Sequence, residues 1–524
     1  DEFKDGKWVS AGYGLRKYGD HVTQLVDRLV DAGVWVYVAI SWGLWADPDD
    51  DRQHRFQQVD AYGNYSPMTS PRGASQALAA MARELKDLLG DKVRGVVLDG
   101  VRYAGEGYGF SPEDRTAFLS ENKKDIPASI SDIPSHGYDG KVWWEERRLF
   151  DDNRENGFTS MLAAIKARCP SIPVSAIVAA DAMCPVGSNS RVGELATGIG
   201  DSFGHGWSMV GMPLDFSRAP DEGSEMRSLE VSAAILRRLA GSSTPLFEVD
   251  LSRVAGFESA FRVLNKYSAS MCVVGRYEDW RLLSDSRQGE LRDAMGSCRV
   301  CAVPTSPYVA IAVSSSSRDV SASALSENAQ WTDRLYSFGA TLLDKLPHRL
   351  RVLFDSDLPS VSVRDGYSAL ALWECENMSD DAVAATEALV GSSVPIAVIG
   401  RCGRYRGRTE EERPELPFVR RFENADSGNE AEYAFEATSG QIDVEETSYA
   451  LGDSAFDRGA VLAFEGGESG YVETLDPSTG TIERKASPFP MLFKGRSVWL
   501  GADADEDDSL VELAGEVAAR AASR

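Results

Sequence analysis

The sequence predicts an α/β fold whose first part has the arrangement of a (β/α)8 TIM-type barrel. Short apolar runs without polar alternation recur through the first 290 residues, and such runs are typical of strands buried on both faces. Helical segments separate these runs, and acidic residues stand at or after most of their ends. Strands that alternate with helices form parallel sheets, and barrels of this class carry their chemistry at the carboxyl ends of the strands.

The most informative unit ends at Asp99. A helix is predicted over 74–89, a wholly apolar strand over 96–98 follows it, and Asp99 comes next, with Arg102 and Tyr103 close behind. Asp99 therefore stands where a barrel enzyme places a functional carboxylate. The alternative is structural: Asp99 caps a turn or pairs with Arg102.

Five further units of the same kind complete this region. The other strands are predicted over 34–40, 173–179, 208–212, 245–247 and 270–274, and the other helices over 20–32, 143–168, 228–240 and 256–267. Besides Asp99, the acidic residues at the strand ends are Asp181, Asp215, Glu248 and Glu278.

The second half of the chain predicts a separate α/β domain with an inserted β module. Strands are predicted over 308–313, 350–354, 369–373 and 395–399, with helices over 328–343 and 379–389. Polar, strand-like segments follow from about residue 423, and a last strand and helix at 496–500 and 509–521 return to the second domain. The predicted domains are 1–300, 301–422, 423–494 and 495–524.

Composition restricts the partners and the cofactors. The net charge of −26 over 524 residues disfavours nucleic acid and anionic membranes, which need a basic surface. No apolar run approaches a membrane span and no signal peptide is recognisable, so a secreted and a cytoplasmic protein both remain open. The seven cysteines and five histidines form no convincing ligand pattern, and we expect neither a metal nor another cofactor.

The unit around Asp99 resembles the glycosyl-hydrolase-like family 10, a family of (β/α)8 barrels. The likeness rests on Asp99-Gly-Val-Arg102-Tyr103, on the preceding Pro67-Met-Thr-Ser-Pro71 and helix, and on 33–45, and it extends more loosely to about residue 290. The family usually has Tyr directly after its Asp, whereas this sequence has Gly100, which makes the substrate contacts differ.

By this resemblance, the six predicted strands lack the first two of an eight-stranded barrel. Two more units would take roughly 60–90 residues, given about 250 for a whole barrel. We therefore expect that the natural gene product extends upstream, or that a separate segment supplies these strands.

The second domain resembles, in its topology, the amidotransferase-like trimerisation domain of family 42 β-galactosidases over residues 308–422. The likeness implies a homo-oligomer, with a trimer favoured. Amidotransferase chemistry needs a cysteine at a nucleophile elbow, and Glu374-Cys375-Glu376 lacks the flanking glycines. We therefore interpret this domain as structural.

These features predict a glycoside hydrolase that uses two carboxylates on a polysaccharide or oligosaccharide. Asp99 is the predicted nucleophile or stabilising carboxylate, and Glu248 or Asp215 the predicted general acid/base, with Glu248 preferred for its longer side chain and apolar neighbours. The predicted substrate contacts are Trp42, Trp45, Arg102, Tyr103, Asp181, His205, Trp207 and Glu278.

Each of these predictions has an alternative. The tryptophans offer rings on which sugars stack, but they would equally plug the mouth of a barrel. A strand-end acid can form a structural ion pair instead of acting in catalysis. A non-catalytic carbohydrate-binding or assembly protein on a degenerate barrel is the alternative function. A metal-dependent deacetylase is disfavoured because no histidines are paired.

Overall fold

The computed structural model divides the chain into two compact units, and each is described by itself. The first comprises Asp1–Pro134, Val142–Arg218 and Leu236–Cys301, and the second comprises Ser135–Lys141, Ala219–Ile235 and Ala302–Arg524. The residues that the structure describes are 2–4, 7–9, 15–33, 35–42, 54–101, 103–104, 107–131, 141–178, 208–214, 222–241, 243–249, 256–267, 270–273, 284–297, 308–314, 316–317, 328–346, 348–390, 392–407, 411–414, 417–418, 422, 439–444, 447–451, 469–475, 482–488, 491–494, 496–500 and 508–523.

A parallel sheet organises the first unit. Its strands, in spatial order, are β10 (Ser270–Val273), β9 (Thr244–Val249), β8 (Met209–Leu214), β7 (Val174–Val178), β6 (Val93–Val101) and β3 (Val36–Ser41). All neighbouring pairs are parallel. The sequence predicted these same six strands, and the parallel α/β class is confirmed.

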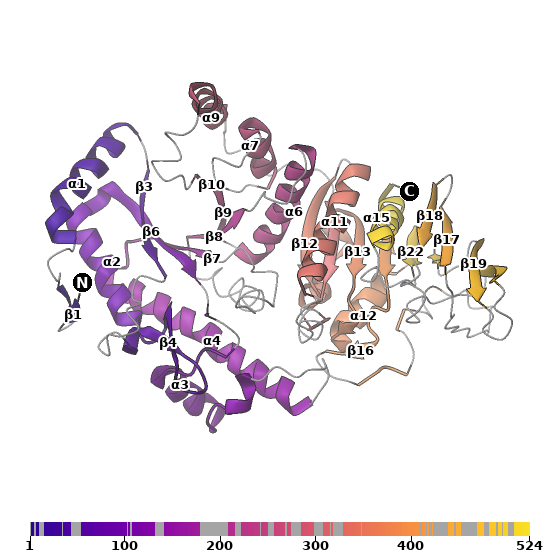
Figure 1. Ribbon diagram of the computed structural model, residues 1–524, viewed down its shortest axis with the longest axis horizontal. Coiled ribbons are helices and arrows are strands. Elements are labelled where there is room, and N and C mark those ends of the chain that lie inside the picture. Colours follow the sequence, from indigo (N-terminus) through magenta and orange to yellow (C-terminus); the bar gives the residue numbers. More distant parts are fainter. Residues whose placement is uncertain are drawn as a thin grey trace. The chain divides into compact units, whose positions relative to one another are not determined.

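Helices follow the strands along the chain and surround them in the first unit (Figure 1). They are α1 (Leu15–Asp31), α2 (Ser75–Leu89), α3 (Pro112–Asn122), α4 (Lys141–Arg168), α7 (Phe257–Lys266) and α9 (Asp285–Ser297). The helix α6 (Glu222–Ala240) is divided, because its residues up to Ile235 belong to the second unit. A short hairpin, β1 (Glu2–Lys4) with β2 (Lys7–Val9), precedes α1.

The two faces of this sheet bury different layers of side chains. Val96 and Leu98 of β6 are fully buried on one face. On the other face Val97, Ile177 and Leu246 form a small apolar cluster from β6, β7 and β9. Asp99 belongs to this second face, because alternate residues of a strand share a face and Asp99 follows Val97 by two.

A second hairpin, which the sequence did not predict, lies between β3 and α2. It consists of a 3-10 turn (His54–Phe56), β4 (Gln57–Val59) and β5 (Tyr65–Thr69). Because this segment leaves β3 and enters α2, it belongs to the loops at the carboxyl end of the sheet.

The second unit is built on another sheet, in the order β12-β11-β13-β15-β22-β21. Its strands are β11 (Tyr308–Val313), β12 (Arg349–Phe354), β13 (Tyr367–Trp373), β15 (Ile396–Ile399), β21 (Met491–Lys494) and β22 (Ser497–Leu500). Only the pair β21–β22 is antiparallel. The helices are α11 (Asn328–Lys345), α12 (Asp380–Leu389) and α15 (Asp508–Ser523), and the two-residue strands β14 (Asn377–Met378) and β16 (Tyr405–Arg406) pair with each other.

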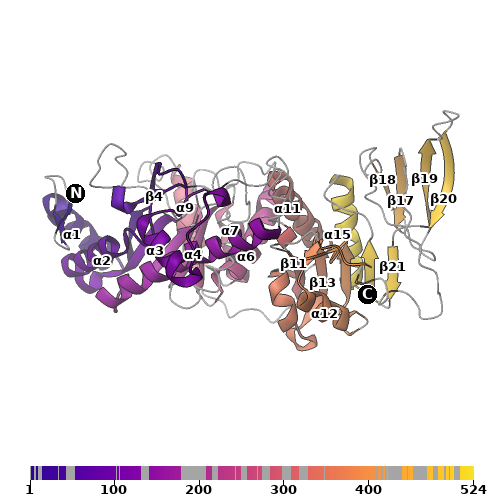
Figure 2. The same ribbon diagram turned by 90° about the horizontal axis from the view of Figure 1, so that it is seen from below.

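The helices α11 and α15 of this unit pack closely against each other. A Cβ on Gly515 of α15 would lie 2.5 Å from Thr341 of α11, so glycine permits the two helices to approach. Between β16 and β21 the chain forms an antiparallel sheet of β17 (Ser439–Val444), β18 (Thr447–Leu451), β19 (Ser469–Leu475) and β20 (Ile482–Pro488), whose strands lie side by side in Figure 2. None of the helices in the described residues is long and apolar enough to cross a membrane.

Candidate active site

Asp99 lies near the carboxyl end of β6, where the strand becomes irregular. It pairs with Ser41 of β3 and Ile177 of β7, and the register to β7 shifts between Asp99 and Val101. Gly100, between them, has a φ of +76°, in the left-handed region that favours glycine. The glycine that replaces the tyrosine of the resembling family therefore fits the backbone at this position.

Asp99 is partly buried, on the sheet face that carries the apolar cluster of Val97, Ile177 and Leu246, and it is in register with Ile177. Burial raises the pKa of its carboxyl. Among the residues that the structure describes, no cation and no hydrogen-bond donor contacts its side chain, so no described partner offsets the effect of burial. The predicted partner Arg102 lies outside the described residues.

Trp42 and Tyr103, two of the predicted substrate contacts, are both buried. Trp42 is 2% exposed and its ring lies 5.7 Å from that of Phe158 in α4. Tyr103 is 0% exposed, meets Phe158 edge-on at 5.5 Å and donates a hydrogen bond to the backbone oxygen of Arg154 at 3.2 Å. Both rings fill the core between β6 and α4, the alternative noted above for the tryptophans, and offer no face to a sugar in this structure.

The backbone position of Glu248 is known from the register of β9. Glu248 pairs with Pro213 of β8 and Cys272 of β10, two residues beyond Leu246. Its position therefore belongs to the face of the sheet that carries Asp99, three strands away. The remaining predicted site residues lie outside the described residues: Trp45, Arg102, Asp181, His205, Trp207, Asp215 and Glu278.

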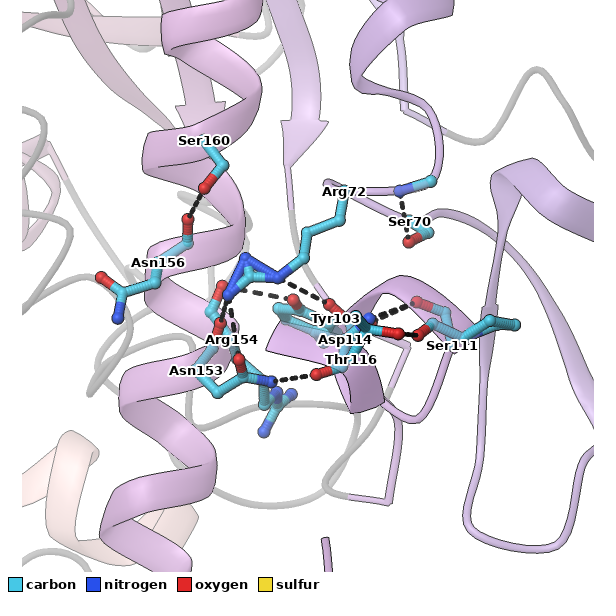
Figure 3. A network of polar contacts seen from close by, with 12 residues as sticks. Ser70, Arg72, Tyr103, Ser111, Asp114, Thr116, Asn153, Arg154, Asn156 and Ser160 are labelled. Carbon is cyan, nitrogen blue, oxygen red and sulfur yellow. Dashed lines mark hydrogen bonds and ion pairs between the residues drawn. The ribbon is translucent and has the colours of Figure 1, made fainter. Parts of the chain in front are cut away.

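A buried polar network lies behind the end of β6 (Figure 3). Arg72, which follows β5, donates from Nη2 to the backbone oxygen of Asn153 at 2.8 Å and to its Oδ1 at 2.9 Å. Its Nε forms an ion pair with Asp114 Oδ1 at 3.4 Å. The Ser111 hydroxyl donates to Asp114 Oδ2 at 2.7 Å, and Asn153 Nδ2 donates to the backbone oxygen of Asp114 at 3.2 Å. The network thus joins the loop after β5 to α3 and α4.

Two fully buried arginines of α4 extend this network. Arg147 donates from Nε to both carboxylate oxygens of Asp151 at 3.1 Å. Arg154 pairs with the same carboxylate at 3.3 Å and lies 4.2 Å from the ring centroid of Tyr103. A buried guanidinium needs such partners, because desolvation is otherwise unfavourable. Through Tyr103, these contacts hold the segment that follows Asp99.

Asp114 is the titratable centre of the network. It is 1% exposed, and burial, opposed by the Ser111 hydrogen bond and by Arg72, raises the pKa of its carboxyl to about 6. Asp114 is covered by protein on every side and therefore fits a positioning role better than contact with substrate.

Sequence reasoning missed the residues of this network, although part of their pattern was visible. Asp114 follows Ser111 by three residues at the start of a helix, the spacing of a side-chain cap. Arg147, Asp151 and Arg154 follow one another at the i,i+4 and i,i+3 spacings of ion pairs on a helix.

The β4–β5 hairpin is fastened to the same strand end. Gln58 Nε2 donates to the backbone oxygen of Thr69 at 2.8 Å, and its Oε1 accepts from the backbone N–H of Ala104 at 2.7 Å. The Thr69 hydroxyl donates to the backbone oxygen of Trp42, whose N–H donates to the backbone oxygen of Asp99 at 2.8 Å. The hairpin and Asp99 therefore belong to one hydrogen-bonded assembly.

The carboxyl end of the second sheet is arranged differently. Its strand order reverses between β11 and β13, where open α/β sheets usually bind ligands. Here the buried loops bind each other: Asn377 N–H donates to Ser317 Oγ at 2.8 Å, and Ser314 Oγ donates to Asn377 O.

Cys375 lacks the features of a nucleophile. Its thiol is 0% exposed and donates to the backbone oxygen of Ala312 at 3.3 Å. Burial and the neighbouring Cys402 thiol raise the pKa of Cys375 well above its ordinary value. The strained backbone position, with φ of +48°, belongs to Glu374 instead. Nucleophilic cysteines need the opposite environment, with a lowered pKa and an accessible sulfur.

No candidate metal centre is present in the described part of the chain, because no group of three or more His, Cys, Asp or Glu side chains there is placed to hold an ion.

Comparison with known proteins supports the fold assignment. No protein-family model matches the sequence, and no curated protein matches it. Solved structures do. The β-galactosidase from Rahnella sp. R3 has a TM-score of 0.64 at 12% identity, over 97% of this chain and 81% of that one. The β-galactosidase of the haloarchaeon Halorubrum lacusprofundi has a TM-score of 0.61 at 11% identity, over 98% and 83% of the two chains.

At such identities the likeness concerns the fold, which is that of TIM-barrel glycoside hydrolases. Among these neighbours is a family 42 β-galactosidase from G. stearothermophilus, with a TM-score of 0.61 at 11% identity over 94% of this chain and 78% of that one. An α-L-fucosidase from Paenibacillus thiaminolyticus has a TM-score of 0.55 at 12% identity, over 95% and 73%. The resemblance to the glycosyl-hydrolase-like family 10 type is not confirmed by these matches.

Proposed function

We propose that the protein is a glycoside hydrolase that cleaves a glycosidic bond in an oligosaccharide or polysaccharide. The observation that carries the proposal is the partly buried Asp99 carboxylate at the carboxyl end of β6, in a chain that shares its fold with glycosidases over nearly its whole length. Strand ends of this kind supply the catalytic residues of TIM-barrel enzymes.

In this proposal Asp99 acts with a second carboxylate, supplied by Glu248 or Asp215. Neighbouring strands lie about 4.8 Å apart and a strand rises about 3.3 Å per residue. Asp99 and Glu248, three strands apart and offset by two residues along the strands, would therefore be separated by roughly 16 Å on a flat sheet. Glycosidase carboxylates lie about 5 Å apart in retaining enzymes and about 6.5–9.5 Å apart in inverting ones. The two positions meet this range only if the sheet curves with their common face inward, as it does in a barrel.

The direction of the Asp99 pKa shift bears on which carboxylate does what. A general acid must hold a proton before the bond breaks, and burial raises the pKa of Asp99. A nucleophilic carboxylate must be ionised. The direction of this shift fits a proton donor to the glycosidic oxygen, whereas the role predicted from the sequence, nucleophile or stabilising carboxylate, needs the ionised form. In either case the second carboxylate supplies the complementary function.

A hydrolysis screen tests this function. The wild-type protein is assayed on nitrophenyl glycosides of galactose and fucose and on soluble glycans, beside Asp99→Asn and Glu248→Gln. The proposal expects release of sugar by the wild type and loss of release in Asp99→Asn. Loss in Glu248→Gln would identify Glu248 as the second carboxylate, and retained release would leave that role to Asp215. Full turnover by a folded Asp99→Asn protein would reject the assignment of Asp99, and no hydrolysis by the wild type on any substrate would favour the carbohydrate-binding alternative.

We further propose that the second unit serves assembly, in a homo-oligomer for which a trimer is favoured. The support is that the polar groups where β11 and β13 end bind each other. In the described residues, these groups therefore serve to hold the strand ends together. Light scattering at micromolar concentration should give a multiple of the 57.0 kDa chain mass. A mass equal to one chain would reject this proposal.

A further inference from the structure

The β4–β5 hairpin carries two solvent-exposed tyrosine rings. Tyr62, at the tip of the hairpin, is 73% exposed, and Tyr65, at the start of β5, is 43% exposed. The ring of His54 stacks on that of Tyr65, with centroids 3.9 Å apart and planes inclined by 13°. The two tyrosine rings project from a hairpin whose strand β4 is buried along its whole length.

The backbone that presents these rings is closely held. The carboxylate of Asp60 accepts hydrogen bonds from the backbone N–H of Tyr62 at 2.9 Å and of Asn64 at 2.8 Å. The side-chain amide of Asn64 donates to the other oxygen of the same carboxylate at 2.8 Å. Gly63 supplies the positive φ of +90° that the turn requires. The tip is therefore ordered before any ligand binds, which lowers the entropy that binding must overcome.

The hairpin lies at the end of the sheet that carries Asp99. It leaves β3 at its carboxyl end, and Thr69 and Trp42 connect it to the backbone of Asp99. On its other side, the backbone N–H groups of Gly109 and Phe110, in the segment after β6, both donate to the oxygen of Val59. Loops at this end of a barrel form the rim around its site.

We propose that Tyr62 and Tyr65, the latter backed by His54, form a sugar-stacking surface that binds one saccharide unit of an extended glycan, away from the bond that is cleaved. This inference rests on the proposed glycosidase function and specifies its substrate as an oligomer or polymer. Sugar rings present apolar C–H faces that pack on aromatic rings, and tyrosine adds a hydroxyl at the polar edge. An ordered aromatic surface on a hairpin that is hydrogen-bonded to the Asp99 strand end fits such a substrate, whereas a free monosaccharide would fill only the site at Asp99.

Binding to soluble β-1,4-galactan, galactomannan and laminarin in affinity gel electrophoresis tests the surface without hydrolysis. The parent is Asp99→Asn, so that the glycan stays intact. Tyr62→Ala and Tyr65→Ala should each weaken the retarding effect of the bound glycan about five- to tenfold, and Tyr62→Phe, which keeps the ring, should retain it. Trp35→Ala is the matched control: Trp35 is 70% exposed but directly precedes β3, at the amino end of that strand, so its removal should leave glycan binding unchanged.

Two results would overturn the proposal. One is a parent protein that binds none of the three glycans. The other is a Tyr62→Ala/Tyr65→Ala double variant that binds as well as the parent, and a loss of oligomeric mass in that variant would instead identify the hairpin as a contact between copies of the chain.

Kinetics with the active protein separates this inference from the proposed function. The Tyr62→Ala/Tyr65→Ala double variant should lose a larger fraction of its kcat/KM on a glycan that retards the parent protein in the gel than on nitrophenyl galactoside. The latter has no second sugar to stack. If Asp99→Asn still hydrolyses while glycan binding depends on the tyrosines, the surface stands and the catalytic assignment fails. If Asp99→Asn is inactive while the tyrosines have no effect, the catalytic assignment stands and the surface fails.

Discussion

Asp99 at the end of β6 and the loops at the end of β13 are the same kind of position in two parallel sheets. In the first unit the carboxylate is partly buried and has no cation or donor against it among the described residues. In the second unit Ser314, Ser317 and Asn377 are buried and bind one another across the strand ends. An unpaired carboxylate is unfavourable for stability and useful for chemistry, whereas satisfied polar groups contribute stability and leave nothing to react.

The strongest test of this difference changes one residue at each strand end and measures both hydrolysis and stability. Asp99→Asn should lower hydrolysis by about a thousandfold or more, because the proposed function makes Asp99 one of the two carboxylates that act on the glycosidic bond. Its melting temperature should stay close to that of the wild type. Cys375→Ala in the second unit should keep full hydrolysis and lose about 1–2 kcal/mol of unfolding free energy through the lost buried sulfur.

Asp87→Asn, an exposed carboxyl on α2, controls for the loss of charge and should be neutral in both assays. If Cys375→Ala abolishes hydrolysis in a folded protein, the second unit is more than structural and the comparison is wrong.

Arg72→Ala tests whether the network behind Asp99 supports the first unit. Asp114 would then remain buried without its cation, and breaking a buried ion pair in this way costs about 3–5 kcal/mol. Arg83→Ala is the matched control, since Arg83 pairs with Asp87 at 3.0 Å on the exposed side of α2. It should cost less than about 1 kcal/mol. Urea unfolding of both variants measures the difference, and equal losses would show that the network contributes no special stability.

The pH dependence of unfolding gives a smaller effect with a defined sign. The pKa of Asp114 is about 6 in the folded protein, above the ordinary value of 3.8, so the folded state binds the proton more tightly than the unfolded state. Its contribution to stability is therefore greatest below about pH 4 and is lost as the pH rises through 6. The loss attributable to this group is at most about 3 kcal/mol. Asp114→Asn should remove that component from unfolding curves recorded between pH 4 and 7, and an unchanged pH dependence would contradict the raised pKa.

The same residues show which parts of the fold and of the candidate site were predictable from the sequence. The strand that ends at Asp99 was predictable because its apolar run is continuous in the chain, and all six strands of the first sheet were found in this way. The ion pair between Arg72 and Asp114 was not predictable, since Arg72 lies in the loop after β5 and Asp114 in α3, and only the folded chain brings the two together. Tyr103 was expected to face a ligand, but its place next to Asp99 in the chain does not reveal that Arg154 covers its ring.

The hairpin after β3 was missed for a local reason. Pro67 lies within β5, and proline within a short polar segment argues against a strand unless that strand lies at an edge. Its pairing partner β4 is three residues long, too short to show an alternating pattern.

The smallest expected effect concerns the residue that follows Asp99. Gly100 adopts a φ of +76°, and no atom lies within 4 Å of the place that a Cβ would occupy. Gly100→Ala therefore meets no steric clash, and only the strained backbone opposes it, by about 1 kcal/mol. Because the strain falls on the peptide next to Asp99, we expect hydrolysis to fall more than stability does, with kcat affected and KM nearly unchanged. Gly90→Ala, which has a φ of +61° and equally open space at the amino end of the same unit, is the control and should cost similar stability with no change in kcat. Equal kcat values for the two variants would show that the bulge at Gly100 serves the fold alone.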